Sequence, residues 1–437
     1  MAERAPGQQG LDRSAWLLII ALTVVLAINI IDRQMMTVLA FAIGTDLKLS
    51  DSQLGVLGGI AFSASYFVFS LPWGWLADRP GANRVWVVSA ALATWSAMTA
   101  LCGLTQNYTQ LLLARMGVAA GEAGCTAPSK ALIAEAVPRS RLAWALSIWG
   151  LGMPLGVIIG RPLGGYLAQI GDWKSAFLIV GVPGIAFALL LAVVFRKFGS
   201  SRRVAASEIA RPVVREALHQ ILRSRSLVFI TLADIVMGAL AMSAAFWGLM
   251  HFQRNLGMSP LDSGLWLGLL AGLSGIAGNL IGGWAADRFA AVRPAHYMKP
   301  AIIGMVLVTP FMFLAWSIDT WWLAMLLLFV PYMADNLAVG GVSAAGQRLL
   351  SPRVRATATS MLGMVTFLLG PGLGVTLFGF ASDFVHDHFA ATAQQSLRWT
   401  LMGSALLYLV PALLYWLAGR NLEDELERFE EPDGAAG

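Results

Sequence analysis

Charged residues are scarce in this chain. Asp, Glu, Lys and Arg make up 13% of its 437 residues, whereas 57% are hydrophobic, and the mean hydropathy is +0.68. A soluble protein of this length could not bury so much apolar surface in its core. Because a membrane-spanning helix needs about 20 apolar residues, the composition indicates a membrane protein with roughly a dozen spans.

Residues that cross-link a fold or hold a metal ion are scarce too. The two cysteines, Cys102 and Cys125, both lie in apolar stretches, so a stabilising disulfide is not expected. The five histidines show no metalloprotease spacing, and no lysine follows a glycine as a phosphate-binding loop requires. We therefore expect a protein that is neither an enzyme nor an ATP-driven pump, needs no metal or cofactor, and has no nucleic-acid partner.

Twelve apolar runs account for most of the chain and are predicted to be membrane helices. They indicate an all-α integral membrane protein in which twelve transmembrane helices form two pseudo-symmetric six-helix bundles. The runs lie at 15–43, 53–77, 85–104, 110–135, 143–169, 175–195, 227–252, 262–286, 299–318, 321–349, 356–382 and 397–419.

The distribution of Lys and Arg predicts the orientation. With a cytoplasmic N-terminus, the inside segments hold 22 Lys and Arg residues, and the outside loops hold only Lys48, Lys174, Arg254 and Arg398. This asymmetry predicts a multi-pass inner-membrane protein with both termini in the cytoplasm. The first apolar run is too long for a signal-peptide core, so we expect it to remain as the first helix.

One long interior loop divides the apolar runs into two sets of six. Within it, Val214, Leu218, Ile221 and Leu222 recur at helical spacing. This pattern predicts a basic amphipathic helix on the inner leaflet or, equally, a solvated linker helix. The acidic C-terminal segment is expected to be solvated and frayed. The predicted organisation is a six-helix bundle (1–195), a basic linker (196–226), a second six-helix bundle (227–419) and an acidic cytoplasmic tail (420–437).

An internal repeat supports the two halves. A shift of 209 positions superimposes GWLADR, which starts at Gly74, on GWAADR, which starts at Gly283. Repeats of this kind build many transporters and place binding sites near the bilayer midplane. The same ungapped shift also matches Ser50 with Ser259, Gly55 with Gly264 and Gly59 with Gly268.

Three motifs resemble those of the major facilitator superfamily. The loop from Gly74 to Arg84 resembles the superfamily's signature between helices 2 and 3, and residues 112–115 followed by Gly121 resemble its helix 4 motif. The resemblance spans about residues 15–419 and implies a secondary transporter that works by alternating access. The glycine–proline pattern of helix 5 is matched by Gly156, Gly160, Pro162, Gly164 and Gly165.

A narrower resemblance is to the Spinster family of lipid transporters and its bacterial relatives. Asp32-Arg33 resembles the family's Asp-Arg pair in helix 1, and Arg115 to Ala123 resembles its Arg-x5-Gly-Glu-Ala stretch in helix 4. The resemblance implies Glu122 as a protonation site and Arg33 as a contact for an anionic headgroup. It also implies an amphipathic anionic lipid as substrate, such as a lysophospholipid or a sphingoid phosphate. A small organic anion or drug-like metabolite is the alternative.

Four charges are expected to converge on helices 1 and 4. Asp32 is expected at a depth similar to that of Arg115, and Glu122 nearer the middle of the membrane. Burial favours the neutral form of a carboxyl, whereas a nearby cation favours its charged form. An arginine that moves can therefore switch the protonation state of the carboxyl. Glu122, with Asp32, is therefore the candidate for proton coupling; a buried ion-pair network that locks the two helices is the alternative. If Asp32 pairs with Arg115, Arg33 is left to bind an anion.

Other intramembrane polar residues extend the candidate site. Asp335 and Asn336 lie near the middle of helix 10, and Arg161 lies near the outer end of helix 5, where it could line the cavity or pair with a headgroup. Asp234 is nearer a helix end and is expected to cap or pack. The residues expected to contact substrate are Arg33, Arg115, Arg161, Asp335 and Asn336.

A conformational latch is predicted in the cytoplasmic loops. Asp78 follows helix 2 and could meet the N-terminus of helix 11, where the helix dipole favours an anion. Asp287 could do the same against helix 5, and a local turn pair between Asp78 and Arg79 is the alternative. We expect a monomer whose partners are the bilayer, protons and a small amphipathic or anionic substrate. The latch residues are Asp78, Arg79, Arg84, Asp287 and Arg288.

Overall fold

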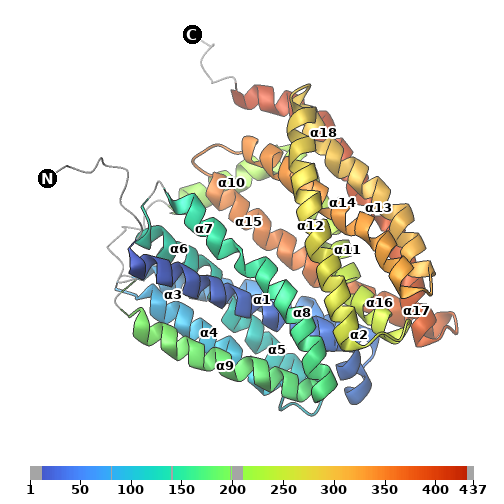
Figure 1. Ribbon diagram of the computed structural model, residues 1–437. Helices are drawn as coiled ribbons and strands as arrows, with labels where there is room; N and C mark the ends of the chain where they lie inside the picture. Colours follow the sequence, from blue (N-terminus) through green and yellow to red (C-terminus); the bar gives the residue numbers. More distant parts are fainter. Residues whose placement is uncertain (1–11, 80, 139–140, 197, 199–209, 431–437) are drawn as a thin grey trace, which may run out of the picture. The chain divides into compact units, whose positions relative to one another are not determined.

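The computed structural model describes residues 12–430 apart from 80, 139–140, 197 and 199–209. In these residues the regular structure is helical throughout (Figure 1). The helices are α1 Arg13–Leu47, α2 Asp51–Gly58, α3 Ile60–Asp78, α4 Arg84–Cys102, α5 Tyr108–Glu122, α6 Thr126–Ala136, α7 Leu142–Gly150, α8 Gly152–Ile170, α9 Trp173–Val194, α10 Ala210–Arg223, α11 Arg225–Arg254, α12 Pro260–Ala290, the 3-10 helix η2 Pro294–Met298, α13 Lys299–Ser317, α14 Trp321–Arg348, α15 Arg355–Phe367, the π-helix η3 Leu368–Gly372, α16 Leu373–His388, α17 Ala393–Leu407 and α18 Leu409–Glu430.

Eleven helical segments in the described part of the chain are long and apolar enough to cross a membrane. The remaining predicted span, 110–135, is present as two shorter helices, α5 and α6. Pro128 accounts for the interruption, because it has no N–H to donate to the carbonyl of Gly124. The chain instead makes a tighter turn in which the Gly124 N–H donates to the Gly121 carbonyl at 3.0 Å.

The chain divides into two compact units. The first contains Met1–Met35, Ser65–Leu163 and Gly171–Val204, and the second contains Met36–Ala64, Gly164–Ile170 and Ala205–Gly437. In the first unit α4 packs against α5 and α9, and in the second α14 packs against α12 and α13. Both packings depend on small residues, as is usual between membrane helices.

One glycine in each unit shows how close these helices come. A Cβ added to Gly121 of α5 would lie 2.5 Å from the backbone nitrogen of Trp95 in α4. A Cβ added to Gly278 of α12 would lie 2.2 Å from the carbonyl oxygen of Met333 in α14. Neither position can carry a side chain unless the helices separate.

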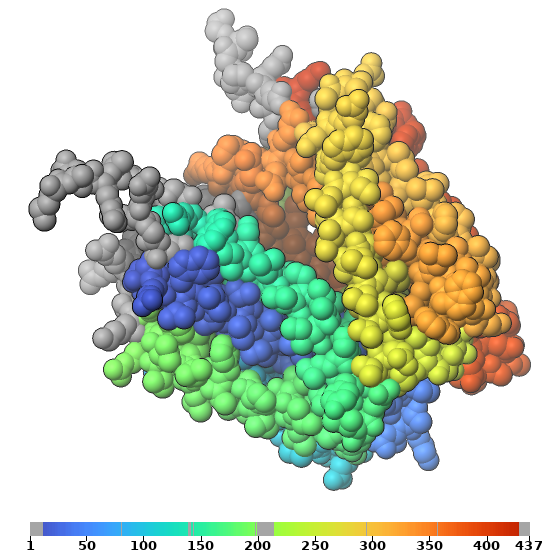
Figure 2. Space-filling view, in the orientation of Figure 1, coloured from blue at the N-terminus to red at the C-terminus, as the bar shows by residue number. Residues whose placement is uncertain are grey.

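Large apolar side chains cover the outer surface of the helices. On α12 the exposed side chains include Leu273, Leu280 and Trp284, which are 62%, 71% and 67% exposed. Figure 2 shows α12 in yellow along the surface of the second unit. Exposed apolar surface of this extent is expected where helices face lipid.

The internal repeat has a structural counterpart. Ser50 caps α2 by accepting a hydrogen bond from the backbone of Gln53, and Ser259 caps α12 by accepting one from Asp262. The matched serines therefore begin equivalent helices. The two then differ, because the first copy is interrupted at Gly59 whereas α12 continues unbroken to Ala290.

The predicted linker helix is confirmed as α10. Gln220 on this helix donates to the Ser351 hydroxyl at 3.0 Å, and the Ser351 N–H donates back to Gln220 at 3.2 Å. Ile221 is buried, whereas Leu218 and Leu222 are exposed. The helix is therefore attached to the second unit and keeps apolar side chains on its outer side.

The prediction of a frayed acidic tail is wrong for residues 420–430, which continue α18. Leu422 and Leu426 lie one turn apart and are both buried. Glu425 accepts hydrogen bonds from the Ser224 hydroxyl at 2.6 Å and the Arg225 N–H at 2.9 Å. Its carboxylate thus caps the N-terminus of α11, where an anion is stabilised by the helix dipole. Residues 431–437 lie outside the described part.

Candidate transport site

The four charges predicted to converge in the first half do come together. Arg33 Nε donates to Glu122 Oε2 at 2.8 Å, and this pair joins α1 to α5. Asp32, Arg115 and Glu122 are 1%, 3% and 1% exposed, whereas the Arg33 side chain keeps 23% exposure. Arg33 is therefore the charged member that solvent or a ligand can reach.

The sequence left Arg33 without a carboxylate partner if Asp32 pairs with Arg115. In the structure, Arg33 is paired with Glu122. Asp32 has Arg115 and Glu122 as electrostatic neighbours and accepts a hydrogen bond from the Thr99 hydroxyl at 3.2 Å. Glu122 is bonded to Arg33 instead. Because residues 32 and 33 point about 100° apart on a helix, Asp32 faces α4 while Arg33 reaches α5.

Several neutral residues of this cluster were not predicted. Thr99 on α4 contacts Asp32, and Asn29 on α1 contacts Glu122. The Tyr66 ring lies under the Arg33 guanidinium, with its centroid 5.4 Å from Cζ. Asn29 precedes Arg33 by four residues, so helical spacing could have identified it. Thr99 and Tyr66 belong to other helices and carried no local signal.

The break between α5 and α6 positions Glu122. Glu122 is the last residue of α5, and a Cβ on Gly124 would lie 2.6 Å from the Trp73 ring. The Trp73 indole N–H donates to the Ala120 carbonyl at 2.7 Å. Trp73 therefore occupies the space beside the turn and holds the end of α5 in place.

Arg161 lies beside the cluster on α8. Its Nε donates to Gln34 Oε1 at 2.9 Å, and it is 6% exposed. Close packing of α8 on α1 makes this possible, since a Cβ on Gly160 would lie 3.0 Å from the Cα of Ile31. Arg161 thus contacts Gln34, the residue next to Arg33.

Asp335 and Asn336 point to different neighbours in the second unit. Asn336 accepts a hydrogen bond from Asn279 of α12 at 3.2 Å and donates to the Tyr332 carbonyl at 2.9 Å. Asp335 is half-buried, and its Oδ1 is buried without a hydrogen-bond partner among the described residues. Asn336 therefore joins α14 to α12, whereas Asp335 retains an unsatisfied acceptor.

Three of the predicted latch residues, Asp78, Arg79 and Arg84, form local contacts within the first unit. Arg84 Nη2 lies 3.2 Å from Asp78 Oδ1, and Arg84 Nη1 pairs with Glu135. Arg79 lies over the Trp75 ring with its Cζ 3.4 Å from the centroid. Asp287 and Arg288 are exposed. The turn pair predicted between Asp78 and Arg79 is replaced by the pair with Arg84.

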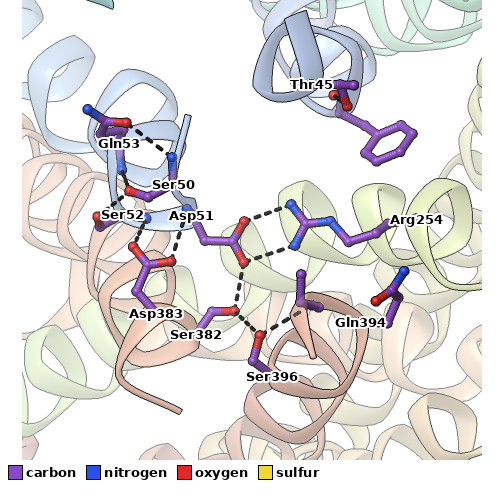
Figure 3. A network of polar contacts seen from close by, with 12 residues as sticks. Thr45, Ser50, Asp51, Ser52, Gln53, Arg254, Ser382, Asp383, Gln394 and Ser396 are labelled. Atoms are coloured by element: carbon purple, nitrogen blue, oxygen red, sulfur yellow. Dashed lines mark hydrogen bonds and ion pairs between the residues drawn. The ribbon is translucent and has the colours of Figure 1, made fainter. Parts of the chain in front are cut away.

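A further polar network in the second unit was missed from the sequence (Figure 3). Arg254 at the end of α11 donates two hydrogen bonds to Asp51, at 3.0 and 2.7 Å, and the Ser382 hydroxyl donates to the same carboxylate at 2.7 Å. Asp383 accepts from the backbone N–H groups of Asp51 and Ser52 at 3.1 and 2.9 Å. We call these residues, Asp51, Arg254, Ser382 and Asp383, the α2 clamp.

The α2 clamp places a carboxylate at the N-terminus of a helix. Asp383 takes this position at α2, and the sequence predicted the same kind of contact for Asp78 at another helix. No local pattern distinguishes Asp51 or Asp383 from other loop-end acids, and their partners lie about 200 to 330 residues away along the chain. The signal was therefore absent from the sequence.

Buried ionisable residues on long apolar helices define a polytopic membrane transporter. Residues 22–375 match the family model of the Major Facilitator Superfamily, and the chain belongs to this family. It is accordingly a multi-pass membrane transporter rather than an enzyme.

Several known proteins are similar to this chain. An MFS-type efflux pump of Mycolicibacterium smegmatis is 31% identical over 95% of both chains. Protein spinster homolog 1 of Xenopus laevis is 23% identical over 95% of this chain and 82% of its own. A crystal structure of a bacterial homolog to the human lysosomal transporter Spinster, in an inward-facing and unoccupied conformation, matches with a TM-score of 0.84 and 24% identity, covering 95% of this chain and 99% of its own. The predicted fold class and the resemblance to Spinster proteins are confirmed.

Proposed function

We propose that this chain is a proton-coupled secondary transporter of amphipathic anionic lipids, of the lysophospholipid or sphingoid-phosphate type. The Arg33–Glu122 ion pair carries the proposal, at 2.8 Å and with the carboxylate fully buried. The predicted roles are protonation for Glu122 and Asp32 and substrate contact for Arg33, Arg115, Arg161, Asp335 and Asn336.

Coupling follows from competition for one guanidinium. While Glu122 is ionised, it occupies Arg33. A proton delivered to Glu122 weakens the pair, and Arg33 can then offer its donors to a phosphate or carboxylate headgroup, which accepts two parallel hydrogen bonds. Proton binding and anion binding thereby favour each other, which is the thermodynamic condition for coupling.

Similarity to known proteins supports the proposed substrate class and an outward direction of transport. Proteins named as Spinster homologues match over most of the chain, and a similar protein of Xenopus tropicalis named a sphingosine-1-phosphate transporter favours a lipid-like substrate. The similar M. smegmatis protein is named an efflux pump, which favours export as the direction of transport. A small organic anion remains the second candidate, because Arg33 would bind its carboxylate equally well.

The test compares Glu122→Gln with the wild-type protein in proteoliposomes. Glutamine keeps the side-chain shape but cannot be deprotonated, so transport driven by a pH gradient should be abolished while ligand binding remains. Glu427→Gln, at an exposed position of α18, is the matched control and should transport normally. Wild-type proton-driven uptake by Glu122→Gln would overturn the coupling role.

A second measurement separates the two substrate classes. One anionic headgroup is titrated with acyl chains of increasing length. A lipid substrate should gain up to about 0.8 kcal/mol of binding free energy for each buried methylene. A flat response would reject the lipid in favour of a small organic anion.

A further inference from the structure

The second unit contains two carboxyls that the proposed coupling does not use. Asp234 lies on α11 and Asp335 on α14, and both are half-buried within membrane-spanning helices. In the described part of the chain neither forms an ion pair with Lys, Arg or His. A carboxylate in such a place is costly unless a cation or a set of donors compensates it.

Tyrosine side chains connect the two carboxyls. The Tyr415 hydroxyl of α18 donates to Asp234 Oδ1 at 2.7 Å, and Asp335 is also within electrostatic reach of Tyr415. Sequence reasoning assigned Asp234 to capping or packing. Its hydrogen bond with Tyr415 joins α11 to α18, and Asp335 is an electrostatic neighbour of the same tyrosine.

Tyr408 gives an independent indication that a ligand belongs here. This residue joins α17 to α18, is 0% exposed, and has a buried hydroxyl without a hydrogen-bond partner in the described residues. Its electrostatic neighbours are Asp335 and Tyr332. A buried polar group without a partner typically costs about 1–3 kcal/mol. The Tyr408 hydroxyl and Asp335 Oδ1 are both in this state among the described residues, and a ligand that brings N–H donors would satisfy both.

We propose that Asp234, Asp335, Tyr408 and Tyr415 form a binding site for an organic ammonium group. The ammonium supplies the missing positive charge and up to three N–H donors, enough for Asp335 Oδ1 and the Tyr408 oxygen together. The tyrosine rings add aromatic faces that favour a cation. Met237, whose sulfur lies 3.6 Å from the Tyr415 hydroxyl, provides an apolar wall for a carbon chain.

The chemistry favours an ammonium over a metal ion. Asp234 and Asp335 are two carboxylates only, and the described residues contain no group of three or more His, Cys, Asp or Glu side chains suited to a metal ion. This inference rests on the proposed transport function and adds a requirement to it, namely that preferred substrates carry an amine as well as an apolar chain.

The test uses three probes with one carbon skeleton: 4-phenylbutylamine, 4-phenylbutanol and 4-phenylbutyrate. Each is titrated calorimetrically into the purified full-length protein. The amine should bind at least tenfold more tightly than the alcohol. Asp335→Asn and Asp234→Asn should each reduce that ratio to below threefold, and Asp387→Asn, at an exposed position of α16, should leave it unchanged.

A variant at Tyr408 distinguishes loss of ligand binding from loss of the fold. Tyr408→Phe removes an oxygen that has no partner in the described chain, so its melting temperature should not fall, whereas its affinity for the amine should. Equal binding of amine and alcohol by the wild-type protein, or unchanged amine affinity in both Asn variants, would overturn the inference. Glu122→Gln should keep the preference for the amine, so failure of proton coupling and failure of this site are observed separately.

Discussion

Arg254 holds the Asp51 carboxylate by two parallel hydrogen bonds, from Nη1 at 3.0 Å and from Nη2 at 2.7 Å. The two side chains keep only 13% and 8% exposure. This bidentate geometry is the strongest arrangement available to such a pair. Asp51 begins α2 and Arg254 ends α11, so the contact joins the start of one helix to the end of the other.

We expect Asp51→Asn to release the α2 clamp. Removing one partner of a buried, hydrogen-bonded charge pair costs about 2–5 kcal/mol, because the other charge is left uncompensated. Spin labels at Lys48 and Ala393, both exposed and outside the clamp, should report a longer or broader distance distribution in this variant. Asp387→Asn is the control. An unchanged distribution would mean that the clamp does not hold these segments together.

Arg33 should discriminate between anionic and neutral ligands. We expect Arg33→Ala to weaken binding of the anionic ligand by at least about tenfold, which corresponds to about 1.4 kcal/mol. Arg33→Lys should restore this only in part, because an ammonium cannot form the planar bidentate contact of a guanidinium. Binding isotherms with the purified protein test both. Wild-type affinity in Arg33→Ala would remove Arg33 from the site.

The variant Asp78→Asn distinguishes the predicted contact of Asp78 with a helix N-terminus from its local ion pair with Arg84. A charge–dipole contact is worth about 0.3–1 kcal/mol, enough to shift a balanced two-state equilibrium severalfold. Spin labels in the loops after α3 and α12 should then move apart. Arg84→Gln removes the local partner, which lies 3.2 Å from Asp78, and serves as the comparison. Identical effects of both variants would show that Asp78 acts only through its ion pair with Arg84.

Glu425→Gln should lower the stability of the second unit. The variant replaces one of the two carboxylate oxygens that accept hydrogen bonds at the N-terminus of α11 with an amide nitrogen, which can only donate. We expect a loss of about 1 kcal/mol, typical of an N-cap, measured as a lower melting temperature in detergent. Glu427→Gln is the control on the same helix. Equal melting temperatures of the two variants would show that the cap contributes nothing.

Some of these features were predictable because their cause is local. The membrane helices depend on runs of apolar residues, and the serine caps at Ser50 and Ser259 depend on a few consecutive residues. Helical spacing also predicted α10. The split of the fourth span was missed although Pro128 indicated it, because the composition of 110–135 resembles that of an unbroken span.

The sequence by itself therefore determined the membrane helices, the repeat, the family and the set of charges kept inside the apolar runs. Only the tertiary structure decided which of those charges meet. Glu122 bonds Arg33 across 89 positions of sequence, and Arg254 bonds Asp51 across 203. Apolar periodicity specifies which face of a helix is buried. The partner on that face depends on how closely neighbouring helices approach, and here small residues such as Gly121 and Gly160 permit that approach.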